Sequence, residues 1–420
     1  MNAVPPHKRR LGKAGRGFAR RSFRAYLPFS RAFHRILDRI DTGLEAGSLE
    51  GHLPDGTIRM LGNRAPGPHA IVHLRSWRAL LRLAAAGSVG WYRAWELGEW
   101  TSPDPVPLFD LFMRNGKALG GAARARGLPR LINRISHAFH RNSRRGARRN
   151  IAFHYDLGND FYNLWLDRNM HYSSALFAEP YSDRESLEDA QTRKADAIID
   201  RLDLRPGASL LEIGCGWGGL AERALERAPV DYHGLTLSAE QATLARTRVA
   251  ASGDDAHIHL TDYRDARGQY DAIASVEMVE AVGERYWPDY LDAIVRLLKP
   301  GGRAAIQYIA IDDALFESYA ASADFIQAYI FPGGMLMSDG RFRALAEARG
   351  LEWRDEHRFG LHYAETLKRW RARFDAAIER GALPPAFDAR FVRLWRYYLM
   401  YCEGGFRGRG IDVAQVTLGR

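Results

Sequence analysis

Between residues 150 and 310, short apolar runs alternate with longer stretches in which apolar residues recur at helical spacing. The short runs predict strands over 209–213, 232–236, 257–260, 272–276 and 304–309. The longer stretches between them predict helices over 220–228, 239–251 and 286–298. Strands separated by helices favour an α/β fold with a doubly wound parallel sheet, in which ligands bind beyond the carboxyl ends of the strands.

The first 150 residues show a different pattern. Basic residues alternate with aromatic ones over 18–29, which predicts an amphipathic helix that runs to about residue 40. This helix would lie either on a membrane surface or against its own domain with the basic face in solvent. Short strand-like runs over 45–75, a helical pattern over 77–86 and aromatic residues over 87–100 predict a small α+β domain.

Composition and charge narrow the classes of partner. The chain has 420 residues, of which 46% are hydrophobic and 26% charged, as is typical of globular proteins. The net charge is +10, and arginines crowd residues 120–150 with almost no acids, so an anionic partner is expected. Zinc-finger and RNA-binding patterns are missing from the sequence, which favours anionic lipid over nucleic acid.

The sequence also predicts where the protein is located and whether it holds a metal. No apolar run approaches the roughly 20 residues of a membrane span, and no secretory signal is recognisable. Two cysteines fit a reducing compartment and cannot form a cysteine-rich zinc site. We therefore expect a cytoplasmic protein, peripheral to the inner face of the membrane, without a metal.

A glycine-rich loop is the strongest local feature of the chain. A predicted strand that contains Glu212 leads into glycines that begin with Gly214 and Gly216, and a helix follows. The dinucleotide pattern G-x-G-x-x-G would place an acid about 20 residues later, whereas here the spacing is G-x-G-x-G-G and the acid precedes the loop. A sulfonium cation fits better, because Glu212, Trp217 and Tyr263 offer a carboxylate and aromatic faces.

Two more predicted strand ends carry polar side chains. Residues 236–241 and 262–264 each follow a predicted strand of the same sheet. Because the carboxyl ends of parallel strands meet at one edge, these residues and the glycine loop should lie together. The three segments therefore outline a nucleoside pocket.

Six motifs carry a specific resemblance. They lie at 154–160, 211–220, 235–241, 262–265, 329–333 and 397–415. Through them the chain resembles the cyclopropane-fatty-acyl-phospholipid synthase family, closely over 150–420 and loosely over 45–115. The resemblance implies an α/β, doubly wound, Rossmann-like methyltransferase sheet with a smaller amino-terminal α+β domain, and S-adenosylmethionine as the methyl donor. Matched residue by residue, the donor contacts fall on Tyr172, Ser173, Gly214, Gly216, Thr236, Gln241, Tyr263 and Arg264.

The resemblance also implies a catalytic centre with two departures. The family adds a methyl group to a cis double bond, and bicarbonate, held by a cysteine, a glutamate, a histidine and a tyrosine, removes a proton to close the ring. Glu280 and Tyr363 match the glutamate and the tyrosine, whereas Ser174 replaces the cysteine and Gln307 the histidine. Serine and glutamine can donate hydrogen bonds but cannot titrate near neutral pH.

These departures change the expected product. Bicarbonate should bind more weakly here, or Glu280 should act directly, and whether the anion binds at all is left open. We expect methyl transfer to an acyl double bond that ends in a methyl-branched or methylene fatty acid, ahead of a cyclopropane. Replacing Glu280 by glutamine is expected to abolish turnover.

The resemblance further suggests a division of the chain and a substrate. We predict a basic tail and helix over 1–44, a small lipid-associated domain over 45–119, an arginine-rich linker over 120–150 and the methyltransferase domain over 151–420. The substrate is expected to be an unsaturated phospholipid, with an anionic membrane surface as partner and a homodimer left open. The alternatives are a true cyclopropane synthase, an enzyme for small or carrier-bound acceptors, and a nucleic-acid-binding module on the same fold.

Overall fold

The computed structural model describes residues 30–120, 157–179, 181–182, 184–250, 255–321 and 324–420. The basic tail and most of the arginine-rich linker predicted from the sequence therefore lie outside the described residues. The first part of the motif at 154–160 lies outside them as well.

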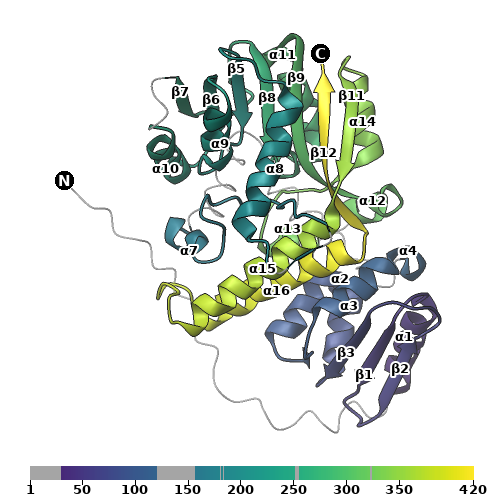
Figure 1. Ribbon diagram of the computed structural model, residues 1–420. Coiled ribbons are helices and arrows are strands. Elements are labelled where there is room, and N and C mark those ends of the chain that lie inside the picture. Colours follow the sequence, from purple (N-terminus) through teal and green to yellow (C-terminus); the bar gives the residue numbers. More distant parts are fainter. Residues whose placement is uncertain (1–29, 121–156, 180, 183, 251–254, 322–323) are drawn as a thin grey trace.

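An eight-stranded sheet forms the larger part of the molecule (Figure 1). Its strand order is β11-β12-β9-β8-β5-β6-β7, with β10 beside β9. The strands are β5 Ser209–Ile213, β6 Asp231–Thr236, β7 Ala256–Leu260, β8 Tyr270–Val276, β9 Leu298–Ile311, β10 Met337–Ser338, β11 Glu352–Arg358 and β12 Ile411–Gly419. Strands β5 to β9 pair in parallel, whereas β12 lies antiparallel between β9 and β11. The predicted α/β class and all five predicted strands are confirmed.

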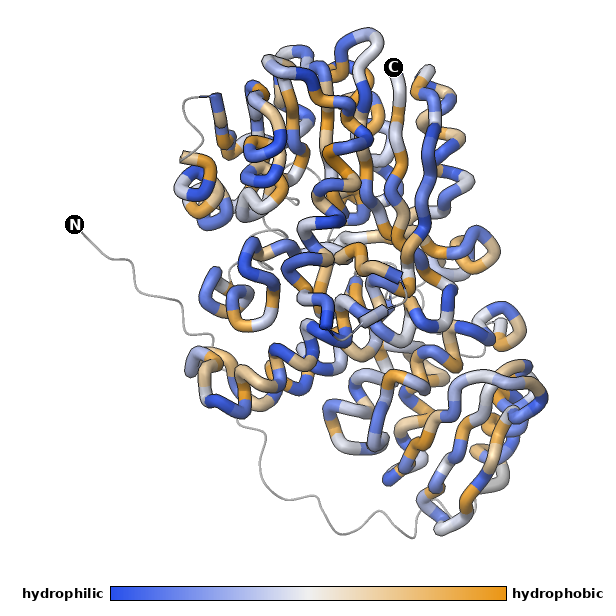
Figure 2. The backbone as a smooth tube through the Cα atoms, in the orientation of Figure 1, coloured by the Kyte–Doolittle hydropathy of each residue, from blue (hydrophilic) through white to orange (hydrophobic). Residues whose placement is uncertain are grey.

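Helices cover both faces of this sheet. They are α8 Leu187–Leu202, α9 Gly219–Arg227, α10 Ala239–Val249, α11 Trp287–Leu297 and α14 Asp339–Glu347. Buried side chains of α8, α9 and α10 form one apolar cluster with the sheet, and those of α11 and α14 form another. The winding is therefore double, and the three predicted helices are confirmed to within two residues at each end. Strand β11 is exposed and hydrophilic along its length (Figure 2).

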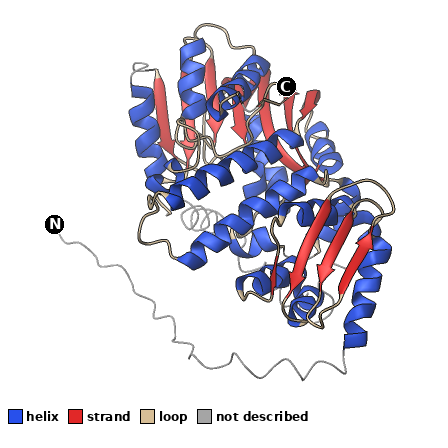
Figure 3. Cartoon of the chain, turned by 60° about the horizontal axis from the view of Figure 1, so that its bottom comes forward, coloured by secondary structure: helices blue, strands red, loops and turns tan. Residues whose placement is uncertain are grey.

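A smaller four-stranded sheet lies apart from the large one, in the order β2-β1-β3-β4 (Figure 3). Its strands and helices are β1 Ser48–His52, β2 Ile58–Gly62, β3 His69–Leu74, β4 Trp100–Thr101, α1 Ser30–Gly43, α2 Arg78–Glu96, α3 Val106–Arg114 and α4 Gly116–Leu119. The helix predicted over 77–86 is the first part of α2, which changes direction at Gly87 (φ 57°). The apolar side of α1 packs on its own sheet, where Phe33 stacks on Trp77 at 5.0 Å.

Two long helices run between the two sheets (Figures 1 and 3). They are α15 Gly360–Glu379 and α16 Ala389–Arg407. Helix α16 lies so close to α3 that a Cβ atom added at Gly404 would overlap Phe109. The small sheet is thereby fixed against the catalytic part of the molecule. The predicted boundaries at residues 44 and 119 stay predictions.

Short elements complete the described chain. They are α7 Asn159–Asn163, α12 Asp313–Ala320, α13 Phe325–Tyr329 and the 3₁₀ helices η3 Val279–Ala281 and η4 Glu284–Tyr286. Helix η3 follows the carboxyl end of β8, so it brings its side chains to the edge of the sheet where a ligand is expected.

Candidate active site

A cavity of about 540 Å³ opens at the carboxyl ends of the parallel strands. It extends from the glycine loop after β5 to helices α2, α3 and α16. All eight predicted donor residues line it: Tyr172, Ser173, Gly214, Gly216, Thr236, Gln241, Tyr263 and Arg264. The structure therefore brings these residues together, as the sequence predicted, although they come from four segments of the chain.

The glycine loop needs its glycines for two different reasons. Gly214 has φ 86°, and a Cβ atom there would overlap Met278. Gly216 has φ 51°, and a Cβ atom there would meet no atom within 4 Å. Positive φ values favour glycine at both positions. Since Gly216 borders the cavity, its missing side chain leaves room for a ligand close to the backbone.

The two other strand ends hold rigid polar groups. Thr236 Oγ1 donates to Gln241 Oε1 at 2.8 Å, at the start of α10. Arg264 pairs with the buried Asp262 through Nη2 and Oδ2 at 2.6 Å, and its guanidinium lies 5.5 Å from the centre of the Tyr263 ring. The buried Tyr263 hydroxyl has no hydrogen-bond partner among the described residues. An open cradle at Gly216 and this unpaired hydroxyl fit a nucleoside.

Charged side chains are buried beside this end of the cavity. Glu212, near the end of β5, accepts a hydrogen bond from the Tyr232 hydroxyl, and burial raises the pKa of Glu212 to about 7. Lys194 of α8 donates to Ser173 Oγ at 2.8 Å, and burial lowers the pKa of Lys194 to about 8. Tyr172 shares a hydrogen bond of 2.8 Å with the Tyr398 hydroxyl. Lys194 lies in none of the sequence motifs and was not predicted as a site residue.

Among the four predicted catalytic residues, Gln307 Nε2 donates to the Ser174 carbonyl at 3.5 Å. Three of the four also hold a fifth residue, Glu277, just beyond β8. The Ser174 backbone N–H and Gln307 Nε2 each donate to Glu277 Oε1 at 2.8 Å. The Tyr363 hydroxyl donates to Glu277 Oε2 at 2.6 Å. According to the resemblance, the residues at these three positions bind a free anion. Here they bind the carboxylate of Glu277.

The hydrogen bonds to Glu277 differ in one respect from what the sequence predicted for Ser174. The Ser174 hydroxyl was expected to replace the cysteine as a donor, but it donates to the Ala175 carbonyl, and the backbone of Ser174 faces the carboxylate. Gln307 donates as expected. Its amide is oriented by Gln415, whose Nε2 donates to Gln307 Oε1 at 3.0 Å.

Glu280 lies in a different environment from Glu277. One of its oxygens accepts from the Ile309 N–H, and the other is buried without a hydrogen-bond partner among the described residues. Burial, and next the charge of Glu277, raise the pKa of Glu280 to about 8. Burial also raises the pKa of Glu277, but Tyr363, Ser174, Gln307 and Lys194 oppose that rise. Of the two carboxyls, Glu277 is therefore the one whose ionised form is stabilised by several donors.

Sequence reasoning missed Glu277, although a signal was present. It stands three residues before Glu280 in the same segment, directly after a predicted strand. A second acid at the carboxyl end of a parallel strand could have been counted as a site candidate.

The far arm of the cavity is apolar. Helices α2, α3 and α16 supply much of its wall. Its side chains include Leu83, Trp91, Phe109, Phe112, Met113 and Phe406. Such a lining favours a hydrocarbon chain, and the small sheet's own helices thereby contribute to the active site.

A doubly wound sheet with a nucleoside cradle, buried carboxyls and an apolar arm defines an S-adenosylmethionine-dependent methyltransferase with an apolar acceptor. The family model described as mycolic acid cyclopropane synthetase matches residues 142–416. This chain belongs to that family of enzymes, which use S-adenosylmethionine to modify unsaturated fatty acyl chains.

Individual relatives agree with this assignment. Tuberculostearic acid methyltransferase UfaA1 of Mycobacterium tuberculosis is 40% identical over 344 residues, or 80% of each chain. Cyclopropane-fatty-acyl-phospholipid synthase of Escherichia coli is 39% identical over 268 residues, which are 64% of this chain and 66% of the relative. The crystal structure of mycolic acid cyclopropane synthase CmaA1, complexed with SAH and CTAB, matches with a TM-score of 0.60 at 30% identity, covering 65% of this chain and 98% of that one.

Proposed function

We propose that this enzyme adds a methyl group to the double bond of a phospholipid acyl chain and forms a branched, still unsaturated product. Glu277 takes the role of the anion that assists the reaction. The observation that supports this proposal is the set of three hydrogen bonds to Glu277 from Ser174, Gln307 and Tyr363. Because the carboxylate already occupies these donors, the proposal requires no bicarbonate.

The donor end binds the cofactor in this proposal. S-adenosylmethionine, when bound, supplies an electrophilic methyl group. The eight predicted donor residues hold it, with Thr236 and Gln241 at polar positions and Tyr263 beside the nucleobase. The support is that all eight line one cavity whose glycine loop leaves open space at Gly216.

The carboxylate end handles the positive charge. When a new carbon–carbon bond forms at one alkene carbon, the neighbouring carbon becomes positively charged. A fixed carboxylate in a cavity closed to water lowers the free energy of that cation. Loss of a proton from the next chain carbon to Glu277 then restores a double bond beside the methyl branch. A hydride shift followed by loss of a proton from the added carbon gives a methylene group instead.

Isotope retention tests this course of reaction. Cells that express the chain are fed methionine with a trideuterated methyl group, and the phospholipid acyl chains are analysed by mass spectrometry. A methyl branch formed by loss of a chain proton retains three deuterium atoms, whereas a cyclopropane or a methylene group retains two. We expect the three-deuterium product, or a two-deuterium product that proton nuclear magnetic resonance identifies as a methylene group, and a cyclopropane as the main product would refute the proposal.

A true cyclopropane synthase is the second candidate. Glu280 supports it, because its buried free oxygen could act as a second acceptor for a proton beside Glu277. The identity to the Escherichia coli cyclopropane-fatty-acyl-phospholipid synthase supports it as well. The isotope count and the form of the product decide between the two candidates.

We further propose that the enzyme works at the surface of an anionic membrane. The net charge of +10 and the apolar arm of the cavity support this. Among the helices that the structure describes, none has both the length and the apolarity of a membrane span. Helix α1 packs on its own sheet, so the attraction is assigned to basic side chains rather than to an inserted helix.

Salt dependence tests the membrane proposal. Screening acts within about 8 Å at physiological ionic strength, so added salt should release the protein from anionic vesicles. Vesicles of neutral lipid and a single-stranded RNA serve as controls. Binding to RNA but not to anionic vesicles would favour the nucleic-acid alternative. The homodimer stays a prediction.

A further inference from the structure

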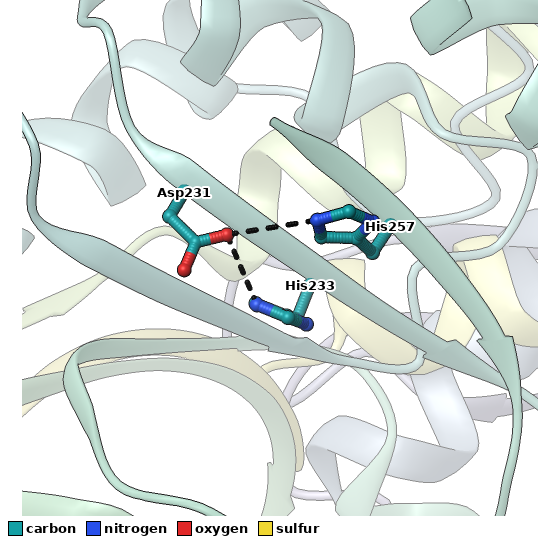
Figure 4. Close-up of side chains that lie close together, drawn as sticks. All are labelled: Asp231, His233 and His257. Atoms are coloured by element: carbon teal, nitrogen blue, oxygen red, sulfur yellow. Dashed lines mark ion pairs between the residues drawn. The ribbon is translucent and has the colours of Figure 1, made fainter. Parts of the chain in front are cut away.

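Three metal-ligating side chains lie together on the surface of the large sheet, away from the cavity. Asp231 and His233 stand two residues apart on β6, and therefore on one face of that strand. His257 on β7 is the Cα partner of His233. Figure 4 shows both imidazoles beside the Asp231 carboxylate. Within the residues that the structure describes, this is the one such group of three or more.

The spacing of the three side chains suits a metal ion. One ligand atom from each lies within 4.8 Å of the others. Asp231 Oδ1 lies 3.0 Å from His233 Nε2 and 4.0 Å from His257 Nε2. Zinc bonds to nitrogen and oxygen of about 2.0–2.1 Å in a tetrahedron place neighbouring ligand atoms roughly 3.3 Å apart. A small movement of His257 toward its neighbours would therefore complete the geometry.

We propose that Asp231, His233 and His257 form a binding site for a divalent transition-metal ion such as Zn²⁺. Two imidazoles and one carboxylate are ligands that zinc accepts, and a water molecule can take the fourth position. The side chains of Asp231 and His257 are about half exposed, so an ion can enter from solvent. Mg²⁺, which prefers oxygen ligands, should bind poorly.

A fourth histidine orients the site. His259 Nε2 lies 3.1 Å from His233 Nδ1. When His233 Nε2 binds a metal, its hydrogen resides on Nδ1 and is donated to His259 Nε2. The ring of Tyr270 packs edge-on against His233 at 5.3 Å and limits its rotation. His259 is therefore a positioning residue rather than a ligand.

The site would join the edge strand β7 to its neighbour β6. These strands lead directly into Thr236 and Tyr263 at the donor end of the cavity. An ion that binds the folded chain but not the unfolded chain stabilises the folded state. We therefore expect the metal to raise the melting temperature of the full chain.

Calorimetry with ZnCl₂ on the untagged, EDTA-treated full chain tests the site. We expect the double variant His233→Asn/His257→Asn to lose one binding equivalent and the rise in melting temperature. His259→Asn should weaken binding by about 10- to 100-fold, as the loss of an outer partner does. His357→Asn is the matched control, because His357 is an exposed histidine on the opposite edge strand, β11.

The calorimetric results of the variants either support or overturn the proposed metal site. Circular dichroism and S-adenosylmethionine binding show whether each variant is folded, which matters most at His233, whose side chain is 22% exposed and packs against Tyr270. Zinc binding with unchanged stoichiometry and affinity in the double variant would overturn the proposal. So would the absence of zinc binding by the wild-type chain, or equal loss of binding in His357→Asn.

Discussion

The two ends of the cavity are built in different ways. At the donor end, the loops after β5, β6 and β7 and the segment of Tyr172 and Ser173 line the cavity, and backbone conformation at Gly214 and Gly216 shapes the glycine loop. At the carboxylate end, side chains from distant segments meet on Glu277. We therefore expect a change of residue at the donor end to alter binding, and a change at the carboxylate end to alter what happens after methyl transfer.

This difference also explains why the residues at the donor end match the family motifs, whereas two residues at the carboxylate end, Ser174 and Gln307, do not. We assign donor binding to a glycine loop whose positive φ values favour glycine, and at Gly214 a Cβ atom would also overlap Met278. An anion held by side chains can be exchanged for a protein carboxylate, provided that the donors remain. Here the donors to Glu277 are the Ser174 backbone N–H, the Gln307 amide that replaces the family's histidine, and the Tyr363 phenol.

The largest effect is expected from Glu277→Gln. The variant keeps the shape of the side chain but removes the negative charge and the proton acceptor. General bases contribute about 10²- to 10⁴-fold to rates, and we expect a loss of that size with S-adenosylmethionine binding unchanged. Single-turnover assays and calorimetry measure the two quantities.

Glu280→Gln is the companion of that variant. With its pKa raised to about 8, Glu280 holds a proton at neutral pH, so an uncharged amide resembles it. We expect a smaller loss of rate than for Glu277→Gln. If Glu280→Gln instead abolishes turnover and Glu277→Gln does not, Glu280 acts as the base or holds it, as the sequence analysis left open.

Gly216→Val tests the donor end. The added side chain projects into open space of the cavity at φ 51° and should crowd the ligand. Overpacking of ~1–3 kcal/mol corresponds to weaker S-adenosylmethionine binding by about 5- to 150-fold, with the fold retained. Gly207→Val is a matched control with positive φ and open space outside the cavity. Undiminished binding by folded Gly216→Val would contradict the assignment.

Tyr363→Phe should shift the pH dependence. The Tyr363 hydroxyl lowers the pKa of Glu277, so its loss raises that pKa and leaves less carboxylate at a given pH. The acid limb of the rate profile should move to higher pH. A hydrogen bond to a charged group is worth about 1.5–3 kcal/mol, which predicts a rate loss of about 10- to 150-fold. A profile that falls without moving would argue against this role.

Gln415→Leu is expected to have the smallest effect. Gln415 orients the Gln307 amide from the neighbouring strand and touches neither carboxyl. Loss of a neutral hydrogen bond costs about 0.5–1.5 kcal/mol, so the rate should fall by about 2- to 10-fold. Donor affinity should not change, and a fall in donor affinity would show that the two ends are not separable.

The fold was predictable wherever apolar pattern and burial agree. Four of the five parallel strands are largely buried and β7 is mostly exposed, and the sequence located each of them. Strand β11, Glu352–Arg358, is polar except for Trp353 because it lies largely exposed at the edge of the sheet, so no alternation marks it. Strand β12 was also missed, since Gln415 and Thr417 interrupt its apolar run although both are buried.

Sequence pattern alone likewise predicted only part of the candidate active site. The family motifs predicted the donor residues, and glycine spacing and strand ends indicated where they meet. The fold brings all eight to one cavity, and their contacts with the donor stay a prediction. Glu277 was not recognised, since its role depends on Tyr363 and Gln307, which are distant in sequence and meet it only in the folded chain. A sequence match identifies a position but does not show which carboxyl the neighbouring side chains hold.

The structure of the purified product tests the central claim most directly. Acyl chains from cells that express this enzyme are isolated as methyl esters and studied by proton nuclear magnetic resonance. If Glu277 replaces the anion and directs the loss of the proton, the new signals are those of a methyl branch beside a double bond or of a methylene group. Upfield cyclopropane protons as the dominant new signals would contradict the account and leave a cyclopropane synthase.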